Sequence, residues 1–389
     1  MHLYVHVPFC ARRCSYCDFA IAVRREVPSA RYVDAVLKER EQTLGRSDAQ
    51  LPHDTGIETL YFGGGTPSHL DPSELERLIV GLLARPQYST PNTQHALREL
   101  TLEANPDDVT PERAAAWVRA GIDRISLGVQ SFDPAVLTWM HRVHTSAQAR
   151  EALKTLRDAG FRNISVDLIY ALPAELTRDW SRDLDEALAL EPEHLSLYGL
   201  TVEPHTPLAK WVAGRGTRVA DDDRYANEFL LAHERLGAAG FEHYEVSNYA
   251  RAGKRAIHNS AYWQRRPFLG LGPSAHSGVA DARWWNTREF AAWLEAVERS
   301  GGQAVGKVQD AAWVADSEIL DAERVRLEDL YLGLRTSDGL AADRLPPKTV
   351  EQWIDAGWAT LTARPPDRPT VRLTAEGWLR LDALVGQVA

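Results

Sequence analysis

The chain has 389 residues, of which 44% are hydrophobic and 25% are charged, as in ordinary globular proteins. Its formal net charge of -10 argues against broad binding to nucleic acids or anionic membranes. No apolar run is long enough to span a bilayer, and the first ten residues lack the pattern of a secretory signal. We therefore expect a cytoplasmic protein of two or three domains that has no nucleic-acid partner.

All three cysteines, Cys10, Cys14 and Cys17, lie within the short segment HVPFCARRCSYCDF. An odd number of closely spaced thiols fits a reducing compartment and metal or redox chemistry. A disulfide framework needs pairs, and a structural zinc site usually needs four ligands. A [4Fe–4S] cluster held by three thiolates would leave one iron open to a small molecule. We expect such a cluster; incidental cysteines, or a zinc shared with His6, are the alternatives.

Six short apolar runs in the first half of the chain have the composition of parallel strands that are buried on both faces. They occupy residues 3–7, 57–62, 99–103, 124–129, 164–169 and 194–199. Helical patterns lie between them, at residues 29–44, 72–84, 111–121, 146–160 and 177–190. This alternation predicts an α/β fold in which six β/α units form a partial, TIM-like (β/α)6 barrel.

Polar or glycine-rich residues follow the predicted strands, and such barrels carry their sites at the C-terminal ends of the strands. In chain order these residues are the cysteine loop, the GGGTP segment at 63–67, Glu103, Gln130, Asp167 and the TVEPHTP segment at 201–207. Glycines let the backbone approach a ligand closely, although GGGTP also suits an ordinary turn. Glu103 and Asp167 could instead form buried salt bridges, because a charge inside a strand needs a partner.

The β/α rhythm ends near residue 220. Residues 223–241 predict a long amphipathic helix, and residues 241–250 predict a strand that leads to the segment HNSAYW (258–263). Residues 281–298 are rich in aromatic side chains, which are usually core at helical spacing. The C-terminal region predicts helices at 317–336 and 349–357, and a hairpin-like piece at 358–385 with an exposed turn at 362–370.

The spacing C-x3-C-x2-C, with Tyr16 before the last cysteine, resembles the cluster loop of radical SAM proteins. The segments YVHVPFC, YFGGGTPSHL, EANPDD, RISLGVQSF, VDLIYALP, HNSAYW and FLGLGPSAHS resemble the family of oxygen-independent coproporphyrinogen dehydrogenase and its relatives, over residues 2–290. The resemblance implies that Cys10, Cys14 and Cys17 hold a [4Fe–4S] cluster whose fourth iron binds S-adenosylmethionine (SAM). It also implies SAM contacts at Tyr4, Gly64, Gly65, Thr66, Glu103, Gln130, Arg142, Asp167 and Thr201.

Two features favour the haem-chaperone branch of this family, the HemW type, over the dehydrogenase. The first cysteine comes without a long preceding arm, and Phe19 stands where the dehydrogenase has a further cysteine. In HemW-like proteins the HNxxYW motif is associated with haem, which implies haem contacts at His258, Asn259, Tyr262 and Trp263. Without the resemblance, a histidine beside aromatic residues is more often a packed core residue.

One segment departs from the family pattern. The residues ALPAEL (171–176) stand where the usual pattern is like GLPGQT, so that Ala171 replaces a glycine and Leu176 a threonine. The resemblance also implies a domain order of a radical SAM barrel (1–215), an extension of helices and strands that carries HNxxYW (216–315), and a small winged-helix-like α+β domain (316–389).

The function implied by the resemblance is a haem chaperone that binds a [4Fe–4S] cluster, SAM and, as cargo, haem. It would pass haem to an acceptor protein, such as a membrane respiratory enzyme, and an electron donor would serve the cluster. The alternative is an oxygen-independent coproporphyrinogen III dehydrogenase, a radical enzyme of haem biosynthesis. A third possibility, an iron–sulfur protein without SAM, conflicts with the polar residues that follow the strands.

Overall fold

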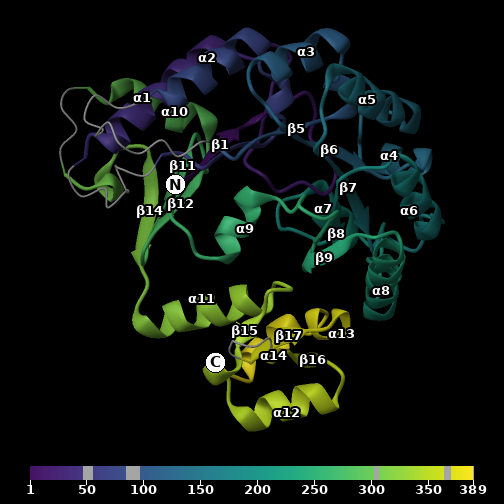
Figure 1. The fold of residues 1–389 in the computed structure, drawn as a ribbon. Helices are drawn as coiled ribbons and strands as arrows, with labels where there is room; N and C mark the ends of the chain where they lie inside the picture. The colour runs from purple at the N-terminus through teal and green to yellow at the C-terminus, as the bar shows by residue number, and fades with distance from the viewer. Residues whose placement is uncertain (47–55, 85–96, 302–305, 363–368, 389) are drawn as a thin grey trace.

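The computed structural model describes residues 1–46, 56–84, 97–301, 306–362 and 369–388. Figure 1 shows a curved sheet with helices over its outer face and a smaller C-terminal unit below it. Most of the turn predicted at 362–370 lies outside the described residues.

Six parallel strands lie side by side in chain order, which confirms the predicted partial barrel. They are β1 (His2–Val7), β4 (Thr59–Gly64), β5 (Glu99–Ala104), β6 (Arg124–Gln130), β7 (Ile164–Tyr170) and β8 (His194–Gly199). Nearly all of their residues are buried, because helices cover one face and the barrel interior covers the other.

The helices that connect these strands start, except for α1, where capping side chains satisfy free backbone N–H groups. They are α1 (Ser29–Leu44), α2 (Pro72–Leu83), α3 (Pro111–Arg119), α5 (Ser146–Ala159) and α6 (Trp180–Ala189). The Asp71 carboxylate accepts from the first turn of α2, and Thr145 forms a capping box with Gln148 at α5. Two short helices, α4 (Pro134–Trp139) and α7 (Pro207–Ala213), were absent from the prediction.

The second half of the chain lengthens the same sheet at both edges. β11 (Phe268–Leu271) pairs in parallel with β1, and β12 (His276–Val279), β13 (Ala282–Asn286) and β14 (Val314–Ile319) follow it antiparallel. At the other edge, β10 (Asn248–Ala250) and β9 (Glu242–Glu245) continue from β8. The strands between residues 216 and 315 thus belong to the sheet of the barrel, and β14 crosses the predicted boundary at residue 315.

Three predicted elements differ from the structure. Residues 241–250, predicted as one strand, form the hairpin of β9 and β10 because the chain turns at 246–247. The segment 281–298 is a strand followed by α10 (Phe290–Arg299), and its Trp284 and Trp293 are core residues as expected. The segment 317–336 begins in β14 and becomes α11 (Ala322–Leu334) only afterwards.

The C-terminal unit has the helix, strand, helix and hairpin order of a winged helix. After α11 come β15 (Leu340–Ala341), α12 (Pro347–Asp355), β16 (Ala359–Thr362), β17 (Thr370–Leu373), α13 (Ala375–Trp378) and α14 (Leu381–Gly386), with the sheet order β15-β17-β16. Arg265, just beyond α9 (Ile257–Trp263), pairs with Glu328 at 2.5 Å and with Asp329 at 3.1 Å on α11. These contacts hold the unit against the barrel through α9 (Figure 1).

The departure at 171–176 has a structural consequence at two of its positions, Ala171 and Leu176. Ala171 has a φ of 55°, in the left-handed region that favours glycine, and its N–H donates to Glu228 Oε2 at 2.7 Å. This conformation costs a non-glycine residue roughly 1–2 kcal/mol. Leu176 packs on an apolar cluster of Val136, Met140, Ile169 and Leu172, which Tyr16 of the cysteine loop also contacts.

We predict that Ala171→Gly changes the free energy of unfolding by less than about 0.5 kcal/mol, although it deletes a buried methyl group. The relief of backbone strain should offset the lost methyl and the greater freedom of the unfolded chain. Ala187→Gly, a matched control at a buried position within α6, should cost about 1–2 kcal/mol. Urea unfolding measures both changes, and equal losses in the two variants would contradict the assignment of strain to Ala171.

Candidate functional site

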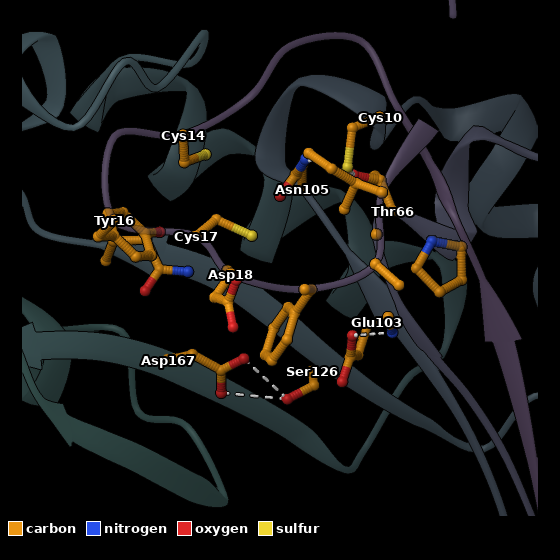
Figure 2. Close-up of a pocket in the computed structure, with 18 of the residues that line it drawn as sticks. Cys10, Cys14, Tyr16, Cys17, Asp18, Thr66, Glu103, Asn105, Ser126 and Asp167 are labelled. Atoms are coloured by element: carbon orange, nitrogen blue, oxygen red, sulfur yellow. Dashed lines mark hydrogen bonds between the residues drawn. The ribbon is translucent and has the colours of Figure 1, made fainter. Parts of the chain in front are cut away.

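A cavity of about 900 Å³ lies at the C-terminal ends of the parallel strands. Its wall brings together the three cysteines and every residue that the resemblance implies as a SAM contact, namely Tyr4, Gly64, Gly65, Thr66, Glu103, Gln130, Arg142, Asp167 and Thr201. Figure 2 shows the cysteine loop with Glu103, Ser126 and Asp167 across the cavity from Cys14 and Cys17. Residues far apart in the sequence thus converge where the strand pattern predicted.

The cysteine loop is fixed at its base and at its tip. Two short parallel strands, β2 (Phe9–Cys10) and β3 (Ala22–Val23), close its base. At the tip, the Ser15 N–H donates to Met140 O at 3.1 Å, and Ser15 O accepts from Leu208 N at 2.9 Å. The three thiols are free and half-buried, so they line the cavity without being sealed from a ligand.

The arrangement of these thiols is compatible with a cubane cluster. In the parts of the chain that the structure describes, no three His, Cys, Asp or Glu side chains converge as a lone metal ion would require. The thiolates of a cubane bind different irons, so they need not meet at one point. His6 is also engaged, because its Nε2 lies 2.9 Å from Ala20 O and its Nδ1 lies 3.1 Å from the Tyr4 hydroxyl. His6 therefore has no free ring nitrogen with which to share a zinc ion with the cysteines.

Hydrogen bonds connect two of the cysteines through side chains of the cavity wall. Thr66 Oγ1 lies 3.3 Å from Cys10 Sγ and accepts from Asn105 Nδ2 at 3.3 Å. Arg142 donates to Asn105 Oδ1 at 2.6 Å and to Cys14 Sγ at 3.6 Å. Burial raises the pKa of the Cys10 thiol to about 12, so that metal binding would have to displace its proton.

Asn105 is a site residue that the sequence analysis missed. It follows β5 directly, two positions after Glu103, and its side chain joins Thr66 to Arg142. The same rule that selected Glu103 and Gln130, a polar residue at the end of a strand, could have selected it.

Glu103 is held by two donors from neighbouring strand β4. The Tyr61 hydroxyl donates to one carboxylate oxygen at 2.7 Å, and the Gly64 N–H donates to the other at 3.1 Å. Burial raises the pKa of Glu103 to about 7. The carboxyl group is therefore poised between its neutral and charged forms near neutral pH.

The glycine segment is needed for close packing as well as for its hydrogen bond to Glu103. Gly64 has a φ of 112°, and a Cβ there would lie 2.6 Å from the His6 ring. A Cβ on Gly65 would lie 2.8 Å from the Phe9 carbonyl oxygen. These glycines bring the end of β4 against the cysteine loop.

The donors that the structure describes for Asp167 on β7 are hydroxyl groups. Ser126 Oγ lies 2.9 and 3.0 Å from its two oxygens (Figure 2), and Ser165 Oγ lies 3.0 Å from one of them. Burial raises the pKa of Asp167 as well. Neither Asp167 nor Glu103 forms an ion pair with any residue in the described ranges, so the buried salt bridges considered as an alternative are not found there. Among the described residues, only the buried Arg124, beyond ion-pair distance, lowers the pKa of both groups by its charge, so two carboxyl groups without a direct ion pair face one cavity, which suits a positively charged ligand.

Gln130 and Thr201 also lie on the cavity wall. Gln130 has a φ of 69° at an irregularity in the pairing of β6 with β7, which turns the end of the strand. Thr201 is exposed, and its hydroxyl donates to Gly199 O at 3.4 Å.

The HNSAYW motif lies apart from most of this wall, on helix α9. Tyr262 lines the cavity, whereas His258, Asn259 and Trp263 are not among the described lining residues. His258 is buried; its Nδ1 lies 2.7 Å from Thr59 Oγ1 and its Nε2 lies 2.8 Å from the Tyr262 hydroxyl. Haem ligation by His258 would require one of these hydrogen bonds to break. Trp263 lies under the Arg335 guanidinium, 4.3 Å from the ring centroid.

Comparison with known proteins relates this arrangement to one superfamily. Residues 4–187 match the radical SAM superfamily, whose members bind a [4Fe–4S] cluster and SAM. The solved structure of coproporphyrinogen III oxidase (HemN) from Escherichia coli, a radical SAM enzyme, aligns with a TM-score of 0.75 at 21% identity, covering 99% of this chain and 88% of that one. At this identity the likeness establishes the fold.

Curated relatives show to which branch of this superfamily the chain belongs. The haem chaperone HemW of Mycobacterium tuberculosis is 36% identical over 347 residues, which is 88% of this chain and 83% of that protein. HemW of Lactococcus lactis is 31% identical over 89% of this chain and 84% of its own length. HemW of Escherichia coli is 36% identical over 72% of this chain and 70% of its own length. The chain therefore belongs to the radical SAM superfamily and, within it, to the family of the haem chaperone HemW.

Proposed function

We propose that this protein is a haem chaperone that binds a [4Fe–4S] cluster, SAM and haem, and passes haem to an acceptor protein. One observation carries the proposal: three free cysteines and two carboxyl groups without ion pairs line a single cavity in a chain of the HemW family. Relatives of this chain are named haem chaperones. An electron donor for the cluster and a haem acceptor, such as a membrane respiratory enzyme, complete the proposal.

The cavity suits SAM by charge and by hydrogen bonding. SAM carries a sulfonium and an ammonium group, and Glu103 and Asp167 supply negative charge without a direct ion pair among the described residues, although arginines also line the cavity. Cys10, Cys14 and Cys17 would hold the cluster, and the Gly64 and Gly65 backbone would lie against the ligand. When bound, the cluster would supply one electron to the SAM sulfonium. Glu103 would bind as the carboxylate, so a protonated Glu103 must first release its proton.

The same cavity offers a surface for a porphyrin. Among its lining residues, Phe19 is 64% exposed, Val143 is 57% exposed and Tyr198 is 45% exposed. Large exposed apolar groups that line one cavity are typical of a binding surface. Arg12 and Arg288 line the cavity too and could pair with the haem propionates. We therefore propose that haem binds at this cavity, with Tyr262 as the contact from the HNxxYW motif.

The runner-up function, oxidative decarboxylation of coproporphyrinogen III, would use the same cluster and SAM. Its support is the likeness to HemN, which establishes the fold.

No helix in the described ranges is long and apolar enough to cross a membrane.

The first prediction from this proposal concerns the metal. Protein that is reconstituted anaerobically should hold about four irons and four sulfides per chain, because three thiolates and one open iron complete a cubane. Cys10→Ala, Cys14→Ala and Cys17→Ala should each abolish the visible absorption of the cluster. Full occupancy by zinc after anaerobic purification would contradict the proposal.

The second prediction concerns the pH dependence of SAM binding. With a pKa near 7, Glu103 is mostly protonated at pH 6 and half ionised at pH 7, so SAM affinity should rise about fivefold over this interval. The α-amino group of SAM titrates above this interval, so it stays charged and does not cause the rise in affinity. Titration calorimetry on the reconstituted protein measures the change.

Glu103→Gln should remove most of this rise, whereas Asp107→Asn should keep it. Asp107 is a matched control, because its carboxyl group lines the same cavity but lies 4.0 Å from His144 Nδ1. A rise that persists in Glu103→Gln would show that another group titrates.

The third prediction concerns haem. The protein should bind about one haem per chain, and Phe19→Ala and Tyr198→Ala should each weaken binding by about 1 kcal/mol through lost contact with the porphyrin face. Val80→Ala is a matched control, because Val80 is also 64% exposed but lies on the outer helix α2. Spectroscopic titration at the Soret band measures the affinities.

The same preparation, given SAM and a reductant, should leave coproporphyrinogen III unconverted. Formation of protoporphyrinogen above background would favour the dehydrogenase. Equal haem affinities in the wild type, Phe19→Ala, Tyr198→Ala and Val80→Ala would contradict haem binding at this cavity.

A further inference from the structure

Helix α9, which carries HNSAYW, contacts the N-terminal ends of strands β4 and β5. The backbone N–H groups of Ile257 and His258 both donate to the Glu99 carboxylate, at 2.9 Å each. Glu99 begins β5, and the ring of His258 reaches β4. The short helix is thus fixed to the two strands that also carry Tyr61 and Glu103.

The His258 ring is a bridge between strand β4 and the end of its own helix. Thr59 Oγ1 lies 2.7 Å from one ring nitrogen, and the Tyr262 hydroxyl lies 2.8 Å from the other. Thr59 also contacts His2 Nδ1 at 2.8 Å, so the hydroxyl connects two imidazoles. Burial lowers the pKa of His258 to about 3, which keeps the ring neutral. Because both of its nitrogens are hydrogen-bonded, the His258 ring is held in one orientation.

In this orientation the His258 ring packs against Tyr61, which donates to Glu103 in the proposed SAM site. The His258 ring stacks on Tyr61 with centroids 5.0 Å apart and an interplanar angle of 27°. Tyr61 stacks in turn on Tyr4, at 6.0 Å and 29°. The Tyr61 hydroxyl, at the far end of the stacked ring, is the group that donates to Glu103 at 2.7 Å.

The packing around Tyr61 leaves little room for another position of its ring. A Cβ on Gly63 would lie 2.8 Å from the Tyr61 ring, 2.9 Å from Tyr4 and 3.1 Å from Glu103 Oε1. The ring therefore has β1 on one side and His258 on another, and its hydroxyl has Glu103 as its partner. Removal of the imidazole would open space on one face of Tyr61.

We infer that His258 is a positioning residue of the SAM site: its ring holds Tyr61 in the place from which the Tyr61 hydroxyl fixes Glu103. The inference rests on the proposed SAM binding and assigns the histidine of HNSAYW to that ligand rather than to haem iron. His258 then acts on the cavity indirectly, through Tyr61.

The test compares SAM binding, by calorimetry on reconstituted protein of equal iron content, in His258→Ala, Tyr61→Phe and the double variant. Each single variant should raise the SAM Kd about tenfold, the usual effect of one lost hydrogen bond to a charged group. The double variant should be no weaker than Tyr61→Phe alone, because both changes remove one interaction. Additive losses, about a hundredfold in the double variant, would overturn the inference.

A pH profile separates positioning from a general loss of structure. The Tyr61 hydrogen bond lowers the pKa of Glu103, so its loss should move the rise in SAM affinity to higher pH in both single variants. His258→Phe retains a flat ring and should restore most of the wild-type affinity; it also serves if the alanine variant does not fold. His243→Ala is the control, because His243 is a buried histidine stacked on Tyr249 at 3.9 Å away from the cavity wall.

Haem titration of the same proteins completes the experiment. His258→Phe should keep the wild-type Soret band and haem affinity. A lost or shifted Soret band with an unchanged SAM Kd and pH profile would make His258 a haem ligand and overturn the inference. Wild-type protein that binds no SAM at all would instead contradict the proposed function, so the two failures are distinct.

Discussion

The site depends on two buried carboxyl groups, those of Glu103 and Asp167, neither of which has an ion-pair partner within the described chain, although the buried Arg124 acts on both at longer range. Burial disfavours their charged forms and raises both pKa values. Hydroxyl and backbone donors hold the two groups in place but supply no positive charge. A cavity built in this way favours a cation that enters it, and the cysteine loop faces the carboxyl groups from across the cavity (Figure 2).

The barrel makes this arrangement possible because adjacent parallel strands end at one edge. Tyr61 and Gly64 on β4 reach Glu103 on β5, and Ser126 on β6 reaches Asp167 on β7. Each carboxyl group is therefore held by a neighbouring strand, in the register of the sheet. Helix α9 supports the same register from the N-terminal ends of β4 and β5 and connects it to the C-terminal unit through Arg265.

Strand order and the residues after each strand could be predicted from the sequence, since apolar runs and the polar positions that follow them are local signals. Those signals sufficed for the parallel strands, the cysteine loop and the site at the strand ends. The partners of individual side chains could not be predicted, because they depend on register and on packing across the barrel. Asn105 could have been selected as a polar residue at the end of β5, but its partners could not, and the double hydrogen bonding of His258 could not be inferred from HNSAYW. The hairpin at 241–250 has apolar residues on both sides of its turn, which concealed the break.

The central claim is that the cavity selects a cation, and the affinities of SAM and S-adenosylhomocysteine test it most directly. The second compound lacks the methyl group and the positive charge of the sulfonium but is otherwise the same ligand. On reconstituted protein at pH 7.5, SAM should bind at least about tenfold more tightly, as expected for roughly 1.4 kcal/mol of charge attraction in a buried site. The preference should shrink when Glu103→Gln and Asp167→Asn are combined. Equal affinities for the two compounds in the wild-type protein would contradict the account.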